Sequence, residues 1–127
     1  MNQNILLIAI LLILAGAMIS KFFGLPVTPF LLRTPTAHTV TMDAKGFSPA
    51  ELTIRVGDIV NFRNSDSRNR WPASDIHPTH ELCQGFDALK AVPPGESYSH
   101  TFSEAKICAF HDHLIPNLRG SITASEE

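Results

Sequence analysis

Apolar and polar residues alternate along several short segments of this chain, which is the pattern of β-strands with one buried face. The clearest segment is 51–56 (ELTIRV), in which Leu52, Ile54 and Val56 lie on one side. Turn signals such as residues 93–96 (PPGE) separate the segments. Together with this segment, we expect strands at residues 39–43, 59–62, 97–102, 106–110 and 119–124.

Short strands separated by turns predict an all-β fold, and we expect a Greek-key β-sandwich. Residues 64–92 interrupt the pattern because they are too long for an ordinary connection. Irregular segments of this length in compact domains are usually functional. The predicted core consists of the apolar residues Phe47, Leu52, Ile54, Val56, Ile59, Val60, Phe62, Phe102 and Ile122.

Residues 1–25 are a separate, largely apolar segment. About 20 apolar residues can span a bilayer, so we predict an uncleaved N-terminal transmembrane helix that anchors the protein to the membrane. A cleaved signal peptide is the alternative, because residues 15–17 (AGA) have the small-x-small form of a cleavage site. Residues 26–37 contain prolines and are expected to form a linker, and residues 38–127 form the predicted domain.

The 127-residue chain has a net charge of −2 and only 8% aromatic residues, which argues against a nucleic-acid partner. Its six histidines are more informative, because four of them form two close pairs. His77 and His80 flank a stiff Pro-Thr dipeptide, and the spacing of His111 and His113 puts both on one face of an extended chain. Clusters of imidazole nitrogens suit copper, zinc, nickel or iron, so these four histidines are the predicted metal ligands.

Several neighbouring residues are expected to support such a site. Asp75 or Glu81 is a candidate to orient one of the imidazole rings through a hydrogen bond. Trp71 and Phe110 are expected to shield the site from water. The other two histidines of the chain are expected to be solvated or hydrogen-bonded rather than ligands: His38 and His100.

The two cysteines, Cys83 and Cys108, allow three interpretations. A disulfide between them would close a loop of about 25 residues and stabilise the fold by about 3 kcal/mol in the chain-entropy model. Alternatively, Cys108 is a thiolate ligand, because its C-x-x-H spacing places it close to His111. The third interpretation is a pair of buried free thiols. Export of the domain would favour the disulfide.

Three segments in this order resemble the cupredoxin family of copper-binding β-sandwiches. They are residues 46–66 (GFSPAELTIRVGDIVNFRNSD), 93–102 (PPGESYSHTF) and 108–124 (CAFHDHLIPNLRGSITA), and the resemblance spans about residues 39–124. More narrowly, residues 71–87 (WPASDIHPTHELCQGFD) with the following FHDHLIPNLRG are similar to bacterial single-domain cupredoxin-like proteins anchored by an N-terminal helix.

The chain also departs from the family pattern. A blue-copper site uses two histidines, a cysteine thiolate and usually an axial methionine. Here Arg70 stands in place of the first histidine and Leu118 in place of the methionine. The thiolate position falls on Cys108 if His111 is the loop histidine, and on Phe110 if His113 is. The resemblance therefore implies a histidine-dominated site at the same end of the sandwich rather than a standard blue-copper centre.

The resemblance implies copper binding, with zinc as the competing metal, and a role in electron transfer with a redox partner protein or in copper handling. It places the domain on the outer face of the membrane, periplasmic or extracellular. Lys21 and Arg33, which follow the hydrophobic segment, favour the opposite orientation. Two alternatives stay open: a copper-dependent oxidoreductase with sites between subunits of an oligomer, and a metal-free structural ectodomain.

Overall fold

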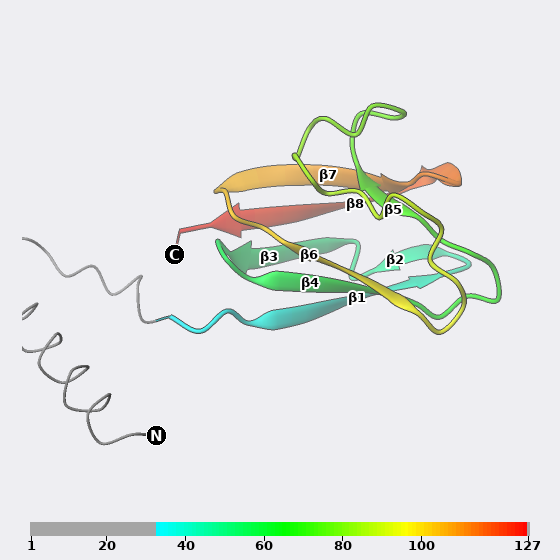
Figure 1. Ribbon diagram of the computed structural model, residues 1–127, viewed down its shortest axis with the longest axis horizontal. Coiled ribbons are helices and arrows are strands. Elements are labelled where there is room, and N and C mark those ends of the chain that lie inside the picture. The colour runs from blue at the N-terminus through cyan, green and yellow to red at the C-terminus, as the bar shows by residue number, and fades with distance from the viewer. Residues whose placement is uncertain (1–32, 127) are drawn as a thin grey trace, which may run out of the picture. The chain divides into compact units, whose positions relative to one another are not determined.

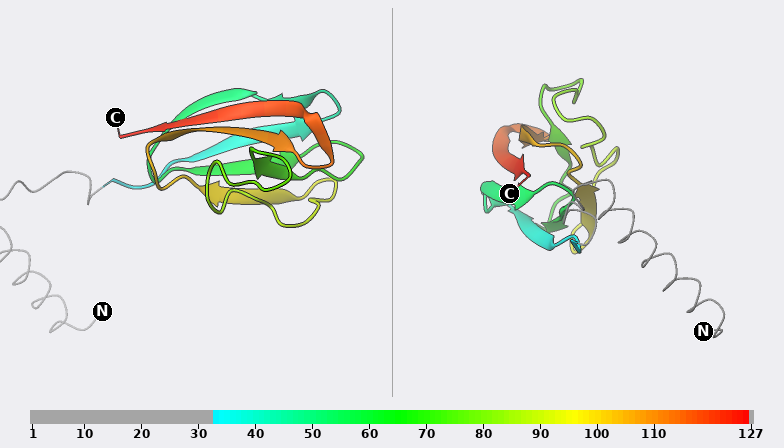
Figure 2. Two further views of the ribbon diagram at one scale, coloured as in Figure 1. Left: turned by 90° about the horizontal axis from the view of Figure 1, so that it is seen from above. Right: turned by 90° about the vertical axis from the view of Figure 1, so that its left-hand side faces the viewer.

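The computed structural model, which describes residues 33–126, contains eight strands, and six of them overlap the alternating segments. Two four-stranded sheets, ordered β2-β1-β4-β6 and β3-β8-β7-β5, pack face to face (Figure 1 and Figure 2). No helix occurs within residues 33–126. The strands are β1 (Ala37–Asp43), β2 (Gly46–Ser48), β3 (Glu51–Arg55), β4 (Ile59–Asn64), β5 (Pro72–Ser74), β6 (Ser97–Thr101), β7 (Lys106–Asp112) and β8 (Ile115–Ser125).

The predicted all-β sandwich is confirmed, and each expected strand overlaps an observed one. Sequence reasoning missed β2 and β5, because a strand of three residues is too short to show a period of two. Both join sheets through antiparallel pairing, β2 with β1 and β5 with β7. The short strand β5 matters for function because it leads directly into the irregular segment that follows.

Most of the predicted core is buried between the sheets. Leu52 packs against it while half-buried. Ile59 is the exception: Val60 and Phe62 are fully buried and point inward, so the adjacent Ile59 points outward and lies outside the core. The buried residues that confirm the prediction are Phe47, Ile54, Val56, Val60, Phe62, Phe102 and Ile122.

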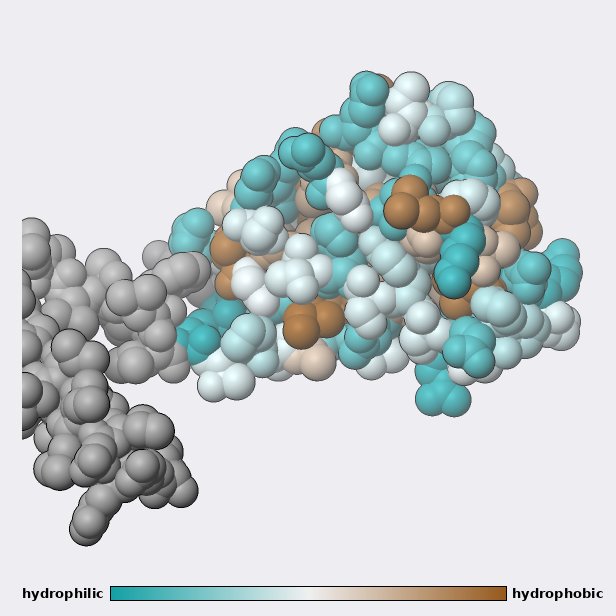
Figure 3. Space-filling view, viewed as in Figure 1, coloured by the Kyte–Doolittle hydropathy of each residue, from teal (hydrophilic) through white to brown (hydrophobic). Residues whose placement is uncertain are grey.

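Residues 75–91, between β5 and β6, form an irregular segment that we call the site loop. It projects beyond the outer side of the sheet that contains β7 (Figure 1). Phe86 anchors it, because this side chain is fully buried and its ring lies 5.2 Å from Phe62, 5.3 Å from Phe102 and 5.5 Å from Phe110. The surface of the domain on the face shown in Figure 3 is a mixture of polar and scattered apolar side chains.

The membrane anchor predicted over residues 1–25 lies outside the described residues, as does most of the predicted linker over 26–37. Within the described range, the chain has no helix of the length and hydrophobicity that crossing a membrane requires. The anchor therefore stays a prediction from the sequence.

Candidate metal centre

The two histidine pairs, more than 30 residues apart in the chain, come together in one cluster. One nitrogen from each of His77, His80, His111 and His113 lies within 4.8 Å of the others. His77 Nδ1 lies 3.3 Å from His111 Nε2, and His113 Nδ1 lies 3.0 Å from His80 Nε2. The structure thus joins each loop histidine to a histidine at or just beyond the end of β7.

Strand β7 determines where His111 points. Cys108 and Phe110 on this strand face the core, so His111, one residue further on, faces the outer side of the sheet. Pairing with Ala73 on β5 fixes its height along the strand, and the site loop then buries it completely. The candidate centre therefore lies on the outer face of this sheet, a position that the expected placement at one end of the sandwich did not specify.

His113 reaches the cluster by a different route from the one expected. Strand β7 ends at Asp112, and its register with β8 shifts between His111 and Asp112. His113 is therefore in the turn, where its backbone N–H donates to the carbonyl of Trp71 over 2.7 Å. The ring centroids of His111 and His113 are 6.5 Å apart, so both still contribute to one cluster.

The site loop presents His77 and His80 from a compact turn. The backbone N–H of His80 donates to the carbonyl of Ile76 over 2.7 Å, and Leu82 N–H donates to the carbonyl of Asp75 over 2.6 Å. His80 has a φ of 57°, in the left-handed region that residues other than glycine seldom adopt. Such backbone outliers concentrate at functional sites, where the surrounding structure enforces them.

Two carboxylates hold two of the rings. Asp75 accepts a hydrogen bond from Nδ1 of His111 at 2.6 Å, and Asp87 lies at the same distance from Nδ1 of His80. Carboxylate contacts of this kind fix the tautomer and orientation of a metal-binding imidazole, leaving Nε2 free to bind. Asp75 was one of the two predicted orienting residues; the other, Glu81, is exposed, and Asp87 takes the second role instead.

The surroundings of His111 and His113 favour the neutral form of these two imidazoles. Burial lowers the pKa of His111, although the nearby Asp75 carboxylate opposes that shift. Burial also lowers the pKa of His113, with added repulsion from His80 and His77. Neutral histidine is the form that binds a metal, so the cluster is suited to ligation near neutral pH.

The donor set also fits a single metal ion in its dimensions. Metal–nitrogen bonds of about 2.0–2.1 Å place two nitrogens on a shared metal about 3–4 Å apart. The two close pairs, at 3.0 and 3.3 Å, already meet this requirement, and the widest separation needs only a small contraction. Four imidazole nitrogens without a thiolate suit copper, zinc, nickel or iron.

One of the two predicted shielding residues covers the cluster. The ring of Trp71 lies 4.6 Å from that of His113, and its indole N–H donates to Asp87 over 2.7 Å. Phe110 does not cover it: adjacent residues of a strand face opposite sides, so Phe110 lies in the core on the other side of β7 from His111.

The structure joins Cys83 and Cys108 in a disulfide with an S–S distance of 1.98 Å. Cys108 therefore has no thiolate to offer as a metal ligand, and its side chain faces the core rather than the histidines. The two single histidines make other contacts. His38 lies 2.9 Å from the Asp58 carboxylate, and His100 stacks on Phe86 with a centroid distance of 5.1 Å.

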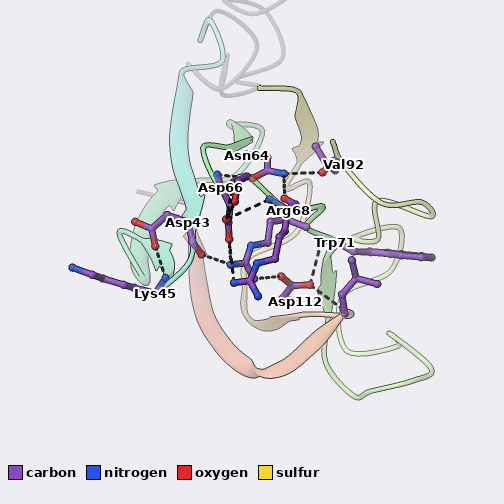
Figure 4. A network of polar contacts seen from close by, with 11 residues as sticks. Asp43, Lys45, Asn64, Asp66, Arg68, Trp71, Val92 and Asp112 are labelled. Atoms are coloured by element: carbon purple, nitrogen blue, oxygen red, sulfur yellow. Dashed lines mark hydrogen bonds and ion pairs between the residues drawn. The ribbon is translucent and has the colours of Figure 1, made fainter. Parts of the chain in front are cut away.

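On the core side of β7, a buried ion-pair network occupies the region around Arg70, the residue in place of the family's first histidine. The Arg70 guanidinium donates to Asp112 over 3.0 Å, to the Asp43 carbonyl over 2.6 Å and, at shorter range, to Asp66. Figure 4 shows how Asp66 and Asp112 converge in this network with Trp71 beside them. The positive charge of Arg70 thus already compensates the negative charges of Asp66 and Asp112 at this position. Asp112 faces away from the histidines, as alternation along the strand requires.

Asp87 and the Arg70 network are the parts of the site that sequence reasoning missed. Asp87 lies seven residues beyond His80 in a segment without periodicity, so no local pattern joins the two. Arg70 was noted as a departure from the family, but its partner Asp112 is 42 residues away and only strand pairing brings them together.

No family model and no curated protein matches this chain. Solved structures do match. A purple cupredoxin from Nitrosopumilus maritimus is 24% identical, with a TM-score of 0.61 over 69% of this chain and 99% of the other. A methionine-to-alanine variant of amicyanin in the Cu(I) state is 25% identical, with a TM-score of 0.59 over 70% of this chain and 82% of the other.

A proline-to-glycine variant of amicyanin in the reduced Cu(I) form gives a TM-score of 0.60 at 23% identity, over 73% of this chain and 86% of the other. These similarities agree with the two-sheet architecture and with the three sequence segments that resemble the family. The described domain therefore has the cupredoxin fold, and the predicted resemblance to cupredoxins is confirmed at that level.

Proposed function

We propose that this protein binds copper through His77, His80, His111 and His113, on a cupredoxin fold that carries the site on the outside of one sheet. The observation that supports this most directly is the approach of four imidazole nitrogens to within 4.8 Å of one another. Similarity to copper-containing amicyanin makes copper the metal of choice, and nothing in the comparisons supports zinc.

The residues around such a copper site would have different roles. Asp75 and Asp87 hold the rings of His111 and His80 with Nε2 turned inward. Trp71 excludes water beside His113, whereas the exposed His77 leaves one side open to solvent. When bound, copper would supply a one-electron Cu(II)/Cu(I) couple. The protein would hold the four nitrogens in place and leave the site accessible from solvent at His77.

The role we propose is electron transfer or copper handling at the outer face of a membrane, with the N-terminal segment as the anchor. A redox partner or a copper-accepting protein would approach at the exposed His77 side. An all-nitrogen site lacks the thiolate of blue-copper centres, so its visible absorption would be weak.

A Cu(II) titration of the full chain tests the proposal. Trp71 is the only tryptophan of the chain, and its ring lies 4.6 Å from His113, so Cu(II) in the cluster should quench its fluorescence. We expect quenching that saturates at one equivalent, with weak visible absorption. Replacing His111 and His113 by alanine should abolish it, whereas His38→Ala, away from the cluster, should not.

An intense thiolate-to-copper band would contradict the all-nitrogen site. Failure to bind copper at micromolar concentration would favour the metal-free structural module instead. If copper does bind, electrochemistry of the copper-loaded protein separates the two roles: a reversible Cu(II)/Cu(I) couple would support electron transfer rather than copper handling.

A further inference from the structure

The Cys83–Cys108 disulfide links the two halves of the candidate metal centre. Cys83 follows His80 by three residues in the site loop, and Cys108 precedes His111 by three residues on β7. Their Cα atoms are 5.8 Å apart. Apart from the main chain, this bond is thus the only covalent connection between the two histidine pairs, His77 with His80 and His111 with His113.

The part of the site loop that carries His77 and His80 has few other attachments. Phe86 anchors the loop after this stretch, and the Asp75 N–H bonds to the Ala109 carbonyl at its start, over 2.9 Å. Between these points the backbone hydrogen bonds of residues 76–82 close within the loop itself. Contacts beyond these also hold the stretch. The exposed Lys106 ammonium donates to the Leu82 carbonyl, the Cys83 N–H donates to the Ser74 hydroxyl of β5 over 2.7 Å, and Nδ1 of His80 lies 2.6 Å from the Asp87 carboxylate. Opening the disulfide would therefore remove the covalent link between the histidine-bearing turn and β7, and these non-covalent contacts alone would hold the turn against the sandwich.

A cavity of about 170 Å³ lies beside the disulfide, whose two cysteines are 7% and 3% exposed. Both cysteines line it, together with the polar and charged residues Gln84, His100, Glu104 and Lys106. A thiolate that enters this cavity would meet the two cysteines in a pocket that Lys106 also lines. A nearby cation stabilises the thiolate that leaves when a disulfide is attacked.

We propose that this cavity is a site of thiol–disulfide exchange with a small thiol, and that reduction of Cys83–Cys108 weakens metal binding at the four histidines. One thiol of the reductant attacks a cysteine sulfur and displaces the other cysteine as a thiolate. A second thiol then resolves the mixed disulfide. Two cysteine thiols and one disulfide of the reductant result, so two electrons and two protons pass to the protein. The proposal rests on the proposed metal-binding function for its consequence, but the exchange step does not.

The exchange step is tested on the full, metal-free chain. The protein is equilibrated with increasing reduced glutathione, trapped with iodoacetamide and weighed by mass spectrometry, while circular dichroism follows the fold. We expect both cysteines to become labelled together with the β-sheet spectrum unchanged. Labelling that occurs only after urea has unfolded the protein would overturn the proposal. When labelling is followed over time at one glutathione concentration, Lys106→Met should slow the reduction of the disulfide, whereas the distant Lys45→Met should not.

The coupling is tested by Cu(II) titration of the oxidised protein and of the Cys83→Ser/Cys108→Ser variant, with Trp71 fluorescence as the readout. We expect the variant to bind between about fivefold and 150-fold more weakly, the usual range for linked sites. Val40→Ala, which removes buried carbon atoms from β1 in the other sheet, controls for general destabilisation. If the variant does not fold, thiol-reduced wild-type protein is titrated with Ni²⁺, which thiols do not reduce.

The outcomes separate the two proposals. Equal affinity in the oxidised and disulfide-free forms would overturn the coupling and leave the four-histidine site standing. Absence of binding in both forms would overturn the proposed function, whatever the glutathione experiment shows. Weaker binding only in the disulfide-free form supports both.

Discussion

The guanidinium of Arg70 donates a hydrogen bond to the carboxylate of Asp112 over 3.0 Å, and both side chains are 1% exposed. Removing one partner of a buried ion pair leaves an uncompensated charge, which costs about 3–5 kcal/mol. Arg70→Met is therefore expected to lower the free energy of unfolding by about that amount. Urea denaturation followed by circular dichroism measures it.

Arg68 provides the matched control for this prediction. Its side chain is 63% exposed and lies 3.6 Å from the same Asp66 that Arg70 contacts. Exposed pairs contribute about 0–1 kcal/mol, so Arg68→Met should change stability little. The double variant Arg70→Met/Asp112→Asn should recover part of the loss, because the amide carries no charge and its oxygen can still accept from the backbone N–H groups of Trp71 and Leu114. If Arg70→Met and Arg68→Met lowered the free energy of unfolding equally, the buried ion pair would contribute no more to stability than the exposed one.

Asp87→Asn and Asp75→Asn are each expected to weaken copper binding by about 10-fold to 100-fold, the usual effect of removing a carboxylate that orients a ligand histidine. The reason is that an amide does not enforce the same tautomer of His80 or His111. Competition with a chelator of known affinity measures the change. Glu81→Gln removes a neighbouring exposed carboxylate and should leave the affinity unaltered.

Acid should destabilise the metal-free protein through three buried or half-buried histidines. Burial lowers the pKa of His100 below 6.5, and the pKa values of His111 and His113 are also lowered. Below pH 6.5 the unfolded chain therefore binds more protons than the folded one, so stability rises with pH in this range. The contribution is fully present above pH 6.5 and is lost as pH falls through the lowered pKa values.

Urea denaturation between pH 5 and pH 7.5 checks this expectation. His100→Gln removes one of the three groups from outside the metal cluster and should flatten the pH dependence. A free energy of unfolding that rises as the solution is acidified from pH 6.5 would contradict the assignment.

Gly120 is required by close packing. A Cβ atom at this position would lie 2.5 Å from Cζ of Phe110 and 2.6 Å from the Ala50 carbonyl oxygen. Gly120→Ala should destabilise the domain by about 1–3 kcal/mol or more, because backbone and a buried ring must move. Thermal unfolding gives the comparison, with Ser121→Ala as the neighbouring control. An unchanged melting temperature would mean that Phe110 can shift without cost.

Much of the fold could be predicted because its signals are local. Alternation in residues 51–56 and 97–102 marks strands, and proline or glycine turns mark their ends. The core prediction placed the adjacent residues Ile59 and Val60 both inside, although only Val60 is buried. It also left out Phe86 and Phe110, which the structure buries. The spacing of the histidine pairs, and the possibility of a bond between the cysteines, could likewise be read along the chain.

The sequence by itself thus determined the all-β class, the cupredoxin resemblance and the identity of the four candidate ligands. Only the tertiary structure decided that the two histidine pairs meet and that Asp87 and Asp75 orient two of the imidazole rings. It also decided that the cluster lies on the outer face of the sheet, whereas Arg70 and Asp112 lie on the core side. The physical reason is that alternation tells which residues share a face of one strand. Which distant segment covers that face depends on the pairing of β5 with β7 and on the burial of Phe86, contacts that no local pattern encodes.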